Sequence, residues 1–93
     1  MPLYSSCRHI PAVKPRWWVY ILRCRDGSLY TGATTEVARR VRQHQVGTGG
    51  AYTASHRPVR LVYTEAVKTH SIALRREAAL KRWTRAQKLA LIR

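Results

Sequence analysis

The sequence predicts one small α/β sandwich of the α+β class, in which three helices flank a three-stranded antiparallel sheet. The chain has 93 residues, enough for a single core, and 45% of them are hydrophobic, so the chain should fold. Strand-like and helix-like segments follow one another in the order β-β-α-β-α-α. Residues 1–15 contain three prolines and no periodicity, so we expect a flexible basic tail there and the folded domain over residues 16–93.

The first two strands are predicted to form a hairpin. Residues 17–24 are aromatic and β-branched, as is typical of a strand. Asp26-Gly27 predicts a tight turn, because glycine tolerates positive φ, and residues 29–32 then form the return strand. Gly32 indicates a strand end or a close approach of the backbone.

A helix and a loop are predicted next. Thr34 or Thr35 is expected to cap a helix that runs to about Val46, with Glu36 in its first turn. Glycines at 47, 49 and 50 end the helix and open a polar loop.

The last third of the chain is predicted to form one strand and two helices. Residues 58–66 are expected to form the third strand. Thr69 or Ser71 is expected to start a helix through about Trp83, and Thr84 to cap a last helix over residues 85–92.

Charge is the dominant compositional feature. The chain carries 18 Lys and Arg against 4 Asp and Glu, a net charge of +14, which favours a polyanionic partner such as DNA, RNA or an anionic membrane. Two cysteines are too few for a disulfide scaffold or a four-ligand zinc site. No apolar run is long enough to span a bilayer and no secretion signal is recognisable, so we expect a cytoplasmic protein.

The first predicted helix places two basic residues on the stripe that should pack on the sheet. At about 100° per residue, Val37, Arg40, Val41 and His44 share one face, whereas Arg39 points elsewhere. Two interpretations of Arg40 are open. Its side chain either extends from the edge of the core to water, or points its charged guanidinium into a cleft beside the sheet.

One acid also lies on an apolar helix face. Glu77 shares that face with Ala73, Leu74 and Leu80. A carboxylate there is costly unless it is paired or binds a metal, so the alternatives are a salt bridge to Arg40 or a neighbouring arginine, and a metal site. Glu65, near a strand end, is expected in solvent.

Two tyrosines lie on the paired strands of the predicted hairpin. With the turn centred on Asp26-Gly27, Tyr20 and Tyr30 occupy adjacent strands and are expected to face the same side of the sheet. A tyrosine pair in strands usually serves packing, so this pair alone indicates little about function.

Several separated motifs together resemble the GIY-YIG nuclease superfamily, and within it the small single-domain bacterial (UPF0213-like) members. Trp18-Val19-Tyr20 and Tyr30-Thr31-Gly32 resemble the two signatures, although Trp18 stands where the family has its first glycine. The segments that continue the resemblance, in the family's order, are residues 32–44, 49–53, 57–63 and 73–81.

The resemblance implies a set of catalytic residues: Tyr20, Tyr30, Arg40, His44 and Glu77. It implies a metal-dependent endonuclease that hydrolyses DNA phosphodiester bonds, with Mg²⁺ or Mn²⁺ at Glu77. Arg40 would stabilise the transition state, and Tyr20 would act as the base if its pKa is lowered. Contacts to DNA are expected from Gly32, Arg57, Arg60, Arg76 and Arg82.

The sequence supports several biological roles for a protein of this kind. We expect a role in DNA repair or recombination at the bacterial nucleoid, on DNA that is branched or flapped, with a protein partner for targeting. Two alternatives are a non-catalytic DNA- or RNA-binding protein that retains the nuclease fold and a ribosome-associated basic protein. A membrane-surface protein is disfavoured because no long amphipathic helix has a continuous basic face.

Overall fold

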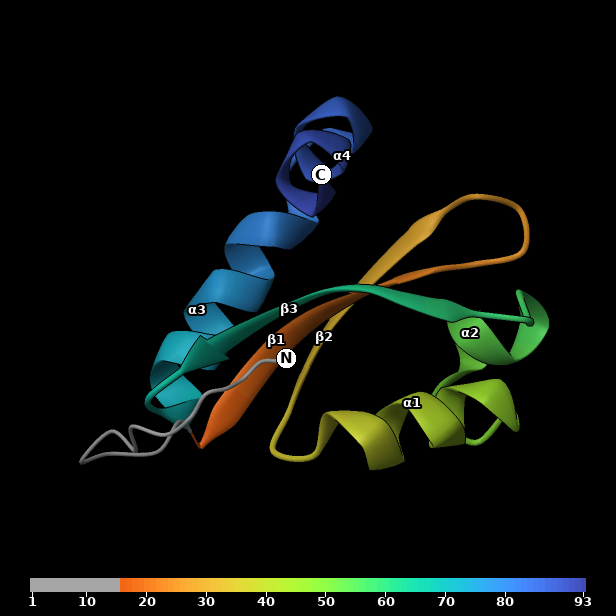
Figure 1. Ribbon diagram of the computed structural model, residues 1–93, viewed down its shortest axis with the longest axis horizontal. Coiled ribbons are helices and arrows are strands. Elements are labelled where there is room, and N and C mark those ends of the chain that lie inside the picture. Colours follow the sequence, from red (N-terminus) through yellow and green to blue (C-terminus); the bar gives the residue numbers. More distant parts are fainter. Residues whose placement is uncertain (1–15) are drawn as a thin grey trace.

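The computed structural model describes residues 16–93, and the predicted N-terminal tail lies outside them. The fold class is confirmed: a three-stranded antiparallel sheet carries helices on both faces (Figure 1). The elements in chain order are β1 (Trp17–Arg23), β2 (Leu29–Thr34), α1 (Val37–Gln45), α2 (Ala51–Ser55), β3 (Arg60–Val67), α3 (His70–Lys81) and α4 (Arg85–Ile92).

The central strand of the sheet is β1. The strand order is β2-β1-β3, and both pairings are antiparallel. In the predicted hairpin, Tyr20 lies opposite Gly32 and Leu22 opposite Tyr30, so the two tyrosines share one face, as expected. Gly27 has a φ of 88° in the turn, which is the conformation that favours glycine there.

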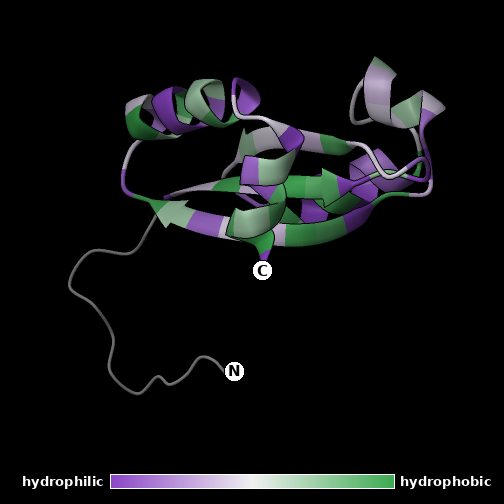
Figure 2. Cartoon of the chain, turned by 90° about the horizontal axis from the view of Figure 1, so that it is seen from above, coloured by the Kyte–Doolittle hydropathy of each residue, from purple (hydrophilic) through white to green (hydrophobic). Residues whose placement is uncertain are grey.

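Two hydrophobic clusters lie on opposite faces of the sheet, because successive residues of β1 point to opposite sides. Tyr20 and Leu22 pack with Val41 of α1 on one face, whereas Val19 packs with Ala73 of α3 on the other. Figure 1 shows α1 and the α3–α4 pair on different sides of the strands. Figure 2 shows hydrophobic residues concentrated in the strands and hydrophilic residues recurring along the helices.

The start of α1 differs from the prediction. Neither Thr34 nor Thr35 is the N-cap; Glu36 is, and its side chain makes no capping hydrogen bond. Thr34 is still part of β2, and its hydroxyl accepts a hydrogen bond from the Glu36 backbone N–H at 3.1 Å. This local turn delays the helix until Val37.

The caps of the two C-terminal helices agree with the sequence. The Thr69 side chain accepts a hydrogen bond from Ile72 N at the start of α3. Thr84 and Gln87 form a reciprocal capping box at the start of α4.

The polar loop predicted after α1 contains an additional short helix, α2. Its five residues are too few to show a helical period in the sequence. It lies beside the β1–β2 turn, where Tyr52 Oη donates a hydrogen bond to Ser28 Oγ at 2.7 Å. None of the helices over residues 16–93 is long and apolar enough to cross a membrane.

Candidate active site

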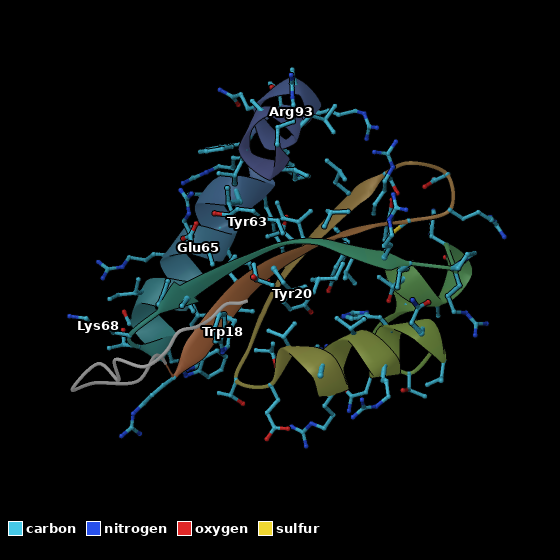
Figure 3. All side chains as sticks on the ribbon, viewed as in Figure 1. Trp18, Tyr20, Tyr63, Glu65, Lys68 and Arg93 are labelled. Carbon is cyan, nitrogen blue, oxygen red and sulfur yellow. The ribbon has the colours of Figure 1, made fainter. Side chains whose placement is uncertain are left out.

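A buried hydrogen bond between Tyr20 and His44 forms the centre of the site. Tyr20 Oη lies 2.9 Å from His44 Nε2, and the two residues are 1% and 0% exposed. Tyr20 comes from the central strand and His44 from the last turn of α1, so the packing of α1 on the sheet brings them together. Figure 3 shows Tyr20 and Trp18 along β1, with α1 beside them.

Gly32 leaves the space that the Tyr20 ring occupies. A Cβ at Gly32 would lie 2.4 Å from the Tyr20 hydroxyl oxygen and 2.5 Å from Cζ, far inside van der Waals contact. The close approach that the sequence predicted at Gly32 is therefore an approach to Tyr20. Gly32 is itself buried, so it contributes to the site by admitting the tyrosine.

Two residues that the sequence reasoning did not select complete the surroundings of His44. Thr53 of α2 is fully buried, and its Oγ1 lies 2.7 Å from His44 Nδ1. A Cβ at Gly49 would lie 2.5 Å from the same nitrogen. Both residues belong to the segment 49–53, whose resemblance to the family motif is the signal in the sequence that indicates them.

The hydrogen bonds around His44 define one consistent set of donors. The Thr53 hydroxyl lies 3.4 Å from the Gly50 carbonyl oxygen, to which it donates, so its oxygen is free to accept from His44 Nδ1–H. His44 Nε2 is then unprotonated and accepts the Tyr20 hydroxyl proton. The ring nitrogens of His44 and the Tyr20 hydroxyl are all paired in this arrangement. Among residues 16–93, the buried hydroxyl of Thr31 is the side-chain polar atom without a hydrogen-bond partner.

Burial controls the ionisation of both central residues. Burial, followed by the nearby charge of Arg40, lowers the pKa of His44, so the imidazole is neutral near pH 7. Burial also raises the pKa of the Tyr20 phenol, and the Tyr30 and Glu77 charges raise it further; Arg40 opposes the shift. The lowered tyrosine pKa that the sequence reasoning required is absent from the free protein.

Arg40 is held next to this pair by two hydrogen bonds. Its guanidinium donates to Gln43 Oε1 and to the Gly49 carbonyl, both at 2.9 Å. The stripe of α1 is therefore confirmed, with Arg40 half-buried and Arg39 exposed. The guanidinium is close enough to Tyr20 to oppose the rise of the tyrosine pKa.

Tyr30 is more accessible than Tyr20 and is held by aromatic contacts. Its ring meets His44 edge-on at 5.3 Å and stacks with Tyr52 at 6.1 Å. Tyr52 in turn stacks on His56 at 4.0 Å. Tyr30, Tyr20 and His44 therefore form one aromatic group on the α1 face of the sheet.

Glu77 lies on α3, which packs on the other face of the sheet. Its carboxylate pairs with Lys81 Nζ at 3.0 Å, so the salt bridge to Arg40 or another arginine is not formed. The Glu77 side chain is 19% exposed, and its charge still reaches the Tyr20 hydroxyl. On the predicted apolar face, Ala73 and Leu80 are buried but Leu74 is 49% exposed.

A single carboxylate is a sparse ligand set for a metal ion. No group of three or more His, Cys, Asp or Glu side chains within residues 16–93 is arranged to hold one. The half-buried Glu77 oxygens suit Mg²⁺, which is commonly bound through one or two carboxylates together with water and substrate phosphates. The donor set therefore fits a magnesium ion that is shared with substrate.

The arginines predicted to contact DNA occupy different surroundings. Arg57 follows α2, Arg60 begins β3 and Arg82 is exposed at the end of α3. Arg76 instead forms an ion pair with Glu65 at 2.9 Å and lies over the Trp83 ring. Glu65, expected in solvent, is 25% exposed in this pair, and Figure 3 shows it on β3 on the α3 side.

This fold and this group of residues define a known class of domain. The profile of the GIY-YIG catalytic domain matches residues 16–90, and the chain belongs to this family.

Its relatives include UPF0213 proteins from several bacteria. One from Cupriavidus pinatubonensis is 48% identical over 79 residues, covering 85% of this chain and 88% of that protein. One from Staphylococcus aureus is 51% identical over 76 residues, covering 82% and 93%. The solution structure of a UPF0213 protein from Bacillus halodurans aligns with a TM-score of 0.53 at 45% identity, covering 82% of this chain and 81% of the other.

Proposed function

We propose that this protein is a metal-dependent endonuclease that hydrolyses phosphodiester bonds in DNA. The observation that carries the proposal is the buried contact between Tyr20 and a neutral His44, with Arg40 beside them. Such a group can accept a proton and stabilise an anion in one place, which is what phosphodiester hydrolysis requires. Membership of the GIY-YIG family supports a nuclease type of activity.

Tyr20 and His44 act as a proton relay in this mechanism. Tyr20 takes a proton from the attacking water as its own proton passes to His44 Nε2, so the tyrosine never persists as a phenolate. This removes the need for a lowered tyrosine pKa, because the neutral imidazole is the final acceptor. Because Tyr20 is 1% exposed in the free protein, the attacking water reaches its hydroxyl together with the bound substrate. Tyr30 is more accessible and orients the phosphate.

Arg40 stabilises the charge that develops on the phosphate. Its guanidinium is already oriented by Gln43 and Gly49, so little reorganisation is required when the transition state forms. A planar fork of donors also matches two phosphate oxygens at once.

Glu77 holds the divalent metal, Mg²⁺ or Mn²⁺, in this proposal. When bound, such an ion supplies Lewis-acid stabilisation of the phosphate and leaving oxygens. Lys81, which pairs with Glu77 in the free protein, releases the carboxylate and is available to a phosphate.

The DNA is held by cations outside the catalytic group. Arg57, Arg60 and Arg82 contact backbone phosphates, whereas Arg76 contributes only if it leaves Glu65. We place the activity in DNA repair or recombination at the bacterial nucleoid, on branched or flapped DNA, with a protein partner that supplies targeting.

Cleavage assays with a charge-matched control test the proposal. Purified protein is incubated with Mg²⁺ or Mn²⁺ and a panel of linear, single-stranded, flapped and four-way DNA. Glu77→Gln should abolish cleavage and leave DNA affinity within about twofold, since one carboxylate contributes little to phosphate binding. Glu36→Gln is the control, because Glu36 is exposed and pairs only with Arg39, at 3.6 Å.

The result also separates the enzyme from a non-catalytic DNA- or RNA-binding protein that retains the fold. Cleavage that persists in Glu77→Gln, or in excess chelator, would refute the metal assignment. A wild-type protein that binds DNA but cleaves no member of the panel with either metal would favour the binding protein.

A further inference from the structure

A basic groove lies at the end of the sheet where the β1–β2 turn meets α2. One hollow of about 340 Å³ is lined by Arg25, Gln45, Ala54, Ser55, Arg57 and Pro58. A second, of about 540 Å³, is lined by Arg23, Cys24, Arg25, Gln45, Pro58, Val59 and Arg60. The two hollows share three lining residues and therefore form one groove. Its arginines are Arg23, Arg25, Arg57 and Arg60.

No carboxylate within the described part of the chain neutralises these arginines. The four acids of the sequence are engaged elsewhere: Glu36 with Arg39, Glu65 with Arg76, Glu77 with Lys81, and Asp26 with Ser28 and His56. The acid nearest in sequence, Asp26, accepts hydrogen bonds from the backbone and the hydroxyl of Ser28. The groove therefore keeps its positive charge.

Two of the arginines are placed against each other by the sheet itself. Arg23 of β1 lies directly opposite Arg60 of β3 in the antiparallel register. Like charges at directly opposite positions destabilise a sheet, so this pair costs folding free energy. An anion bound between the two guanidinium groups would convert this repulsion into attraction.

The walls of the groove are already fixed in the free protein. The Gln45 side chain bonds both the N–H and the carbonyl of Val59, which ties the end of α1 to the start of β3. Arg57 donates to the Ala54 carbonyl at 3.1 Å, and the Arg25 backbone N–H donates to His56 O at 3.0 Å. A ligand would therefore meet a backbone frame and an Arg57 side chain that are already in place.

We propose that this groove binds phosphates of the DNA backbone several nucleotides away from the scissile phosphate. The inference rests on the proposed function for its ligand class, DNA, and it extends the contact surface to Arg23 and Arg25. Cys24, which lines the groove directly after the end of β1, is four positions further along the chain than Tyr20. At roughly 3.3 Å per residue this is about 13 Å, which is the axial rise of about four base pairs of a duplex.

The test removes the opposed pair and measures how binding depends on salt. The double variant Arg23→Gln/Arg60→Gln is compared with Arg39→Gln/Arg42→Gln, which loses the same charge from exposed positions on α1. Each protein is titrated without metal into a fluorescent DNA duplex at several salt concentrations. The slope of log K against log salt should become less steep by about 1.8 in the first variant, since each lost phosphate contact contributes about 0.9, and by less than half of that in the control.

Folding and cleavage are measured separately, so that failure of the groove proposal can be told apart from failure of the proposed nuclease activity. Arg23→Gln/Arg60→Gln should unfold at the same temperature as the wild type or higher, because a repulsive pair is removed. A slope equal to that of the wild type, or to that of the control, would overturn the groove assignment whether or not the protein cleaves DNA. If the slope changes by about 1.8 in Arg23→Gln/Arg60→Gln but the wild type cleaves no DNA, the groove assignment stands and the proposed nuclease activity is refuted.

Discussion

Replacing Gly32 with alanine should destabilise the protein through a single contact, and the magnitude follows from the geometry. The new Cβ would lie 2.4, 2.5 and 3.0 Å from three atoms of the Tyr20 side chain. That ring is 1% exposed and hydrogen-bonded to His44, so it cannot turn aside freely. Overpacking costs about 1–3 kcal/mol and loss of the hydrogen bond about 1 kcal/mol, so we expect a loss of about 2–4 kcal/mol.

A double-mutant cycle shows whether Tyr20 is the cause. Tyr20→Leu removes the clashing atoms, so Gly32→Ala should cost less than about 0.5 kcal/mol in that background. The free energy of unfolding is measured for the four proteins by urea denaturation followed by circular dichroism. Costs that add within about 0.5 kcal/mol would refute the reasoning, because they would mean that alanine at position 32 acts independently of the tyrosine.

Three further predictions concern the residues around Tyr20. Arg40→Ala should lower the cleavage rate by about 10²–10³-fold with DNA affinity nearly unchanged, and Arg39→Ala should be silent; exchanged phenotypes would contradict the role of Arg40. Because the pKa of His44 is lowered by folding, its contribution to stability is present above the unfolded value of about 6.5 and is lost as the pH falls toward the folded pKa. Urea titrations from pH 8 to about 5 should show this loss, and His44→Asn should flatten the profile. Thr53→Val should cost about 1–3 kcal/mol by leaving His44 Nδ1 unpaired, with most of it restored in Thr53→Ser; equal stability of the wild type and both variants would contradict a stabilising hydrogen bond between Thr53 and His44.

The elements and the candidate residues were accessible from the sequence because their determinants are local. A run of aromatic and β-branched residues predicted β1, Asp26-Gly27 predicted the turn, and Thr84 predicted the start of α4, all of which the structure contains. The stripe that carries Arg40 and His44 also follows from helical spacing alone.

The tertiary structure decided which side chains of the site are in contact with one another. Tyr20 and His44 are 24 positions apart in the sequence, and their contact depends on the face of the sheet against which α1 packs. Thr53 enters the site on α2, a helix of five residues that is too short for the sequence to reveal. Spacing along the chain gives no information on such contacts, because packing and sheet twist set them.

The same limit applies to charge. The sequence gives a net charge of +14, but only the register of β1 and β3 places Arg23 opposite Arg60. A salt bridge to an arginine was one of the two alternatives for Glu77, and the residue that pairs with it is instead Lys81, one turn further along the same helix. Total charge is fixed by composition, whereas the distances that determine what each charge does exist only after the strands and helices have packed.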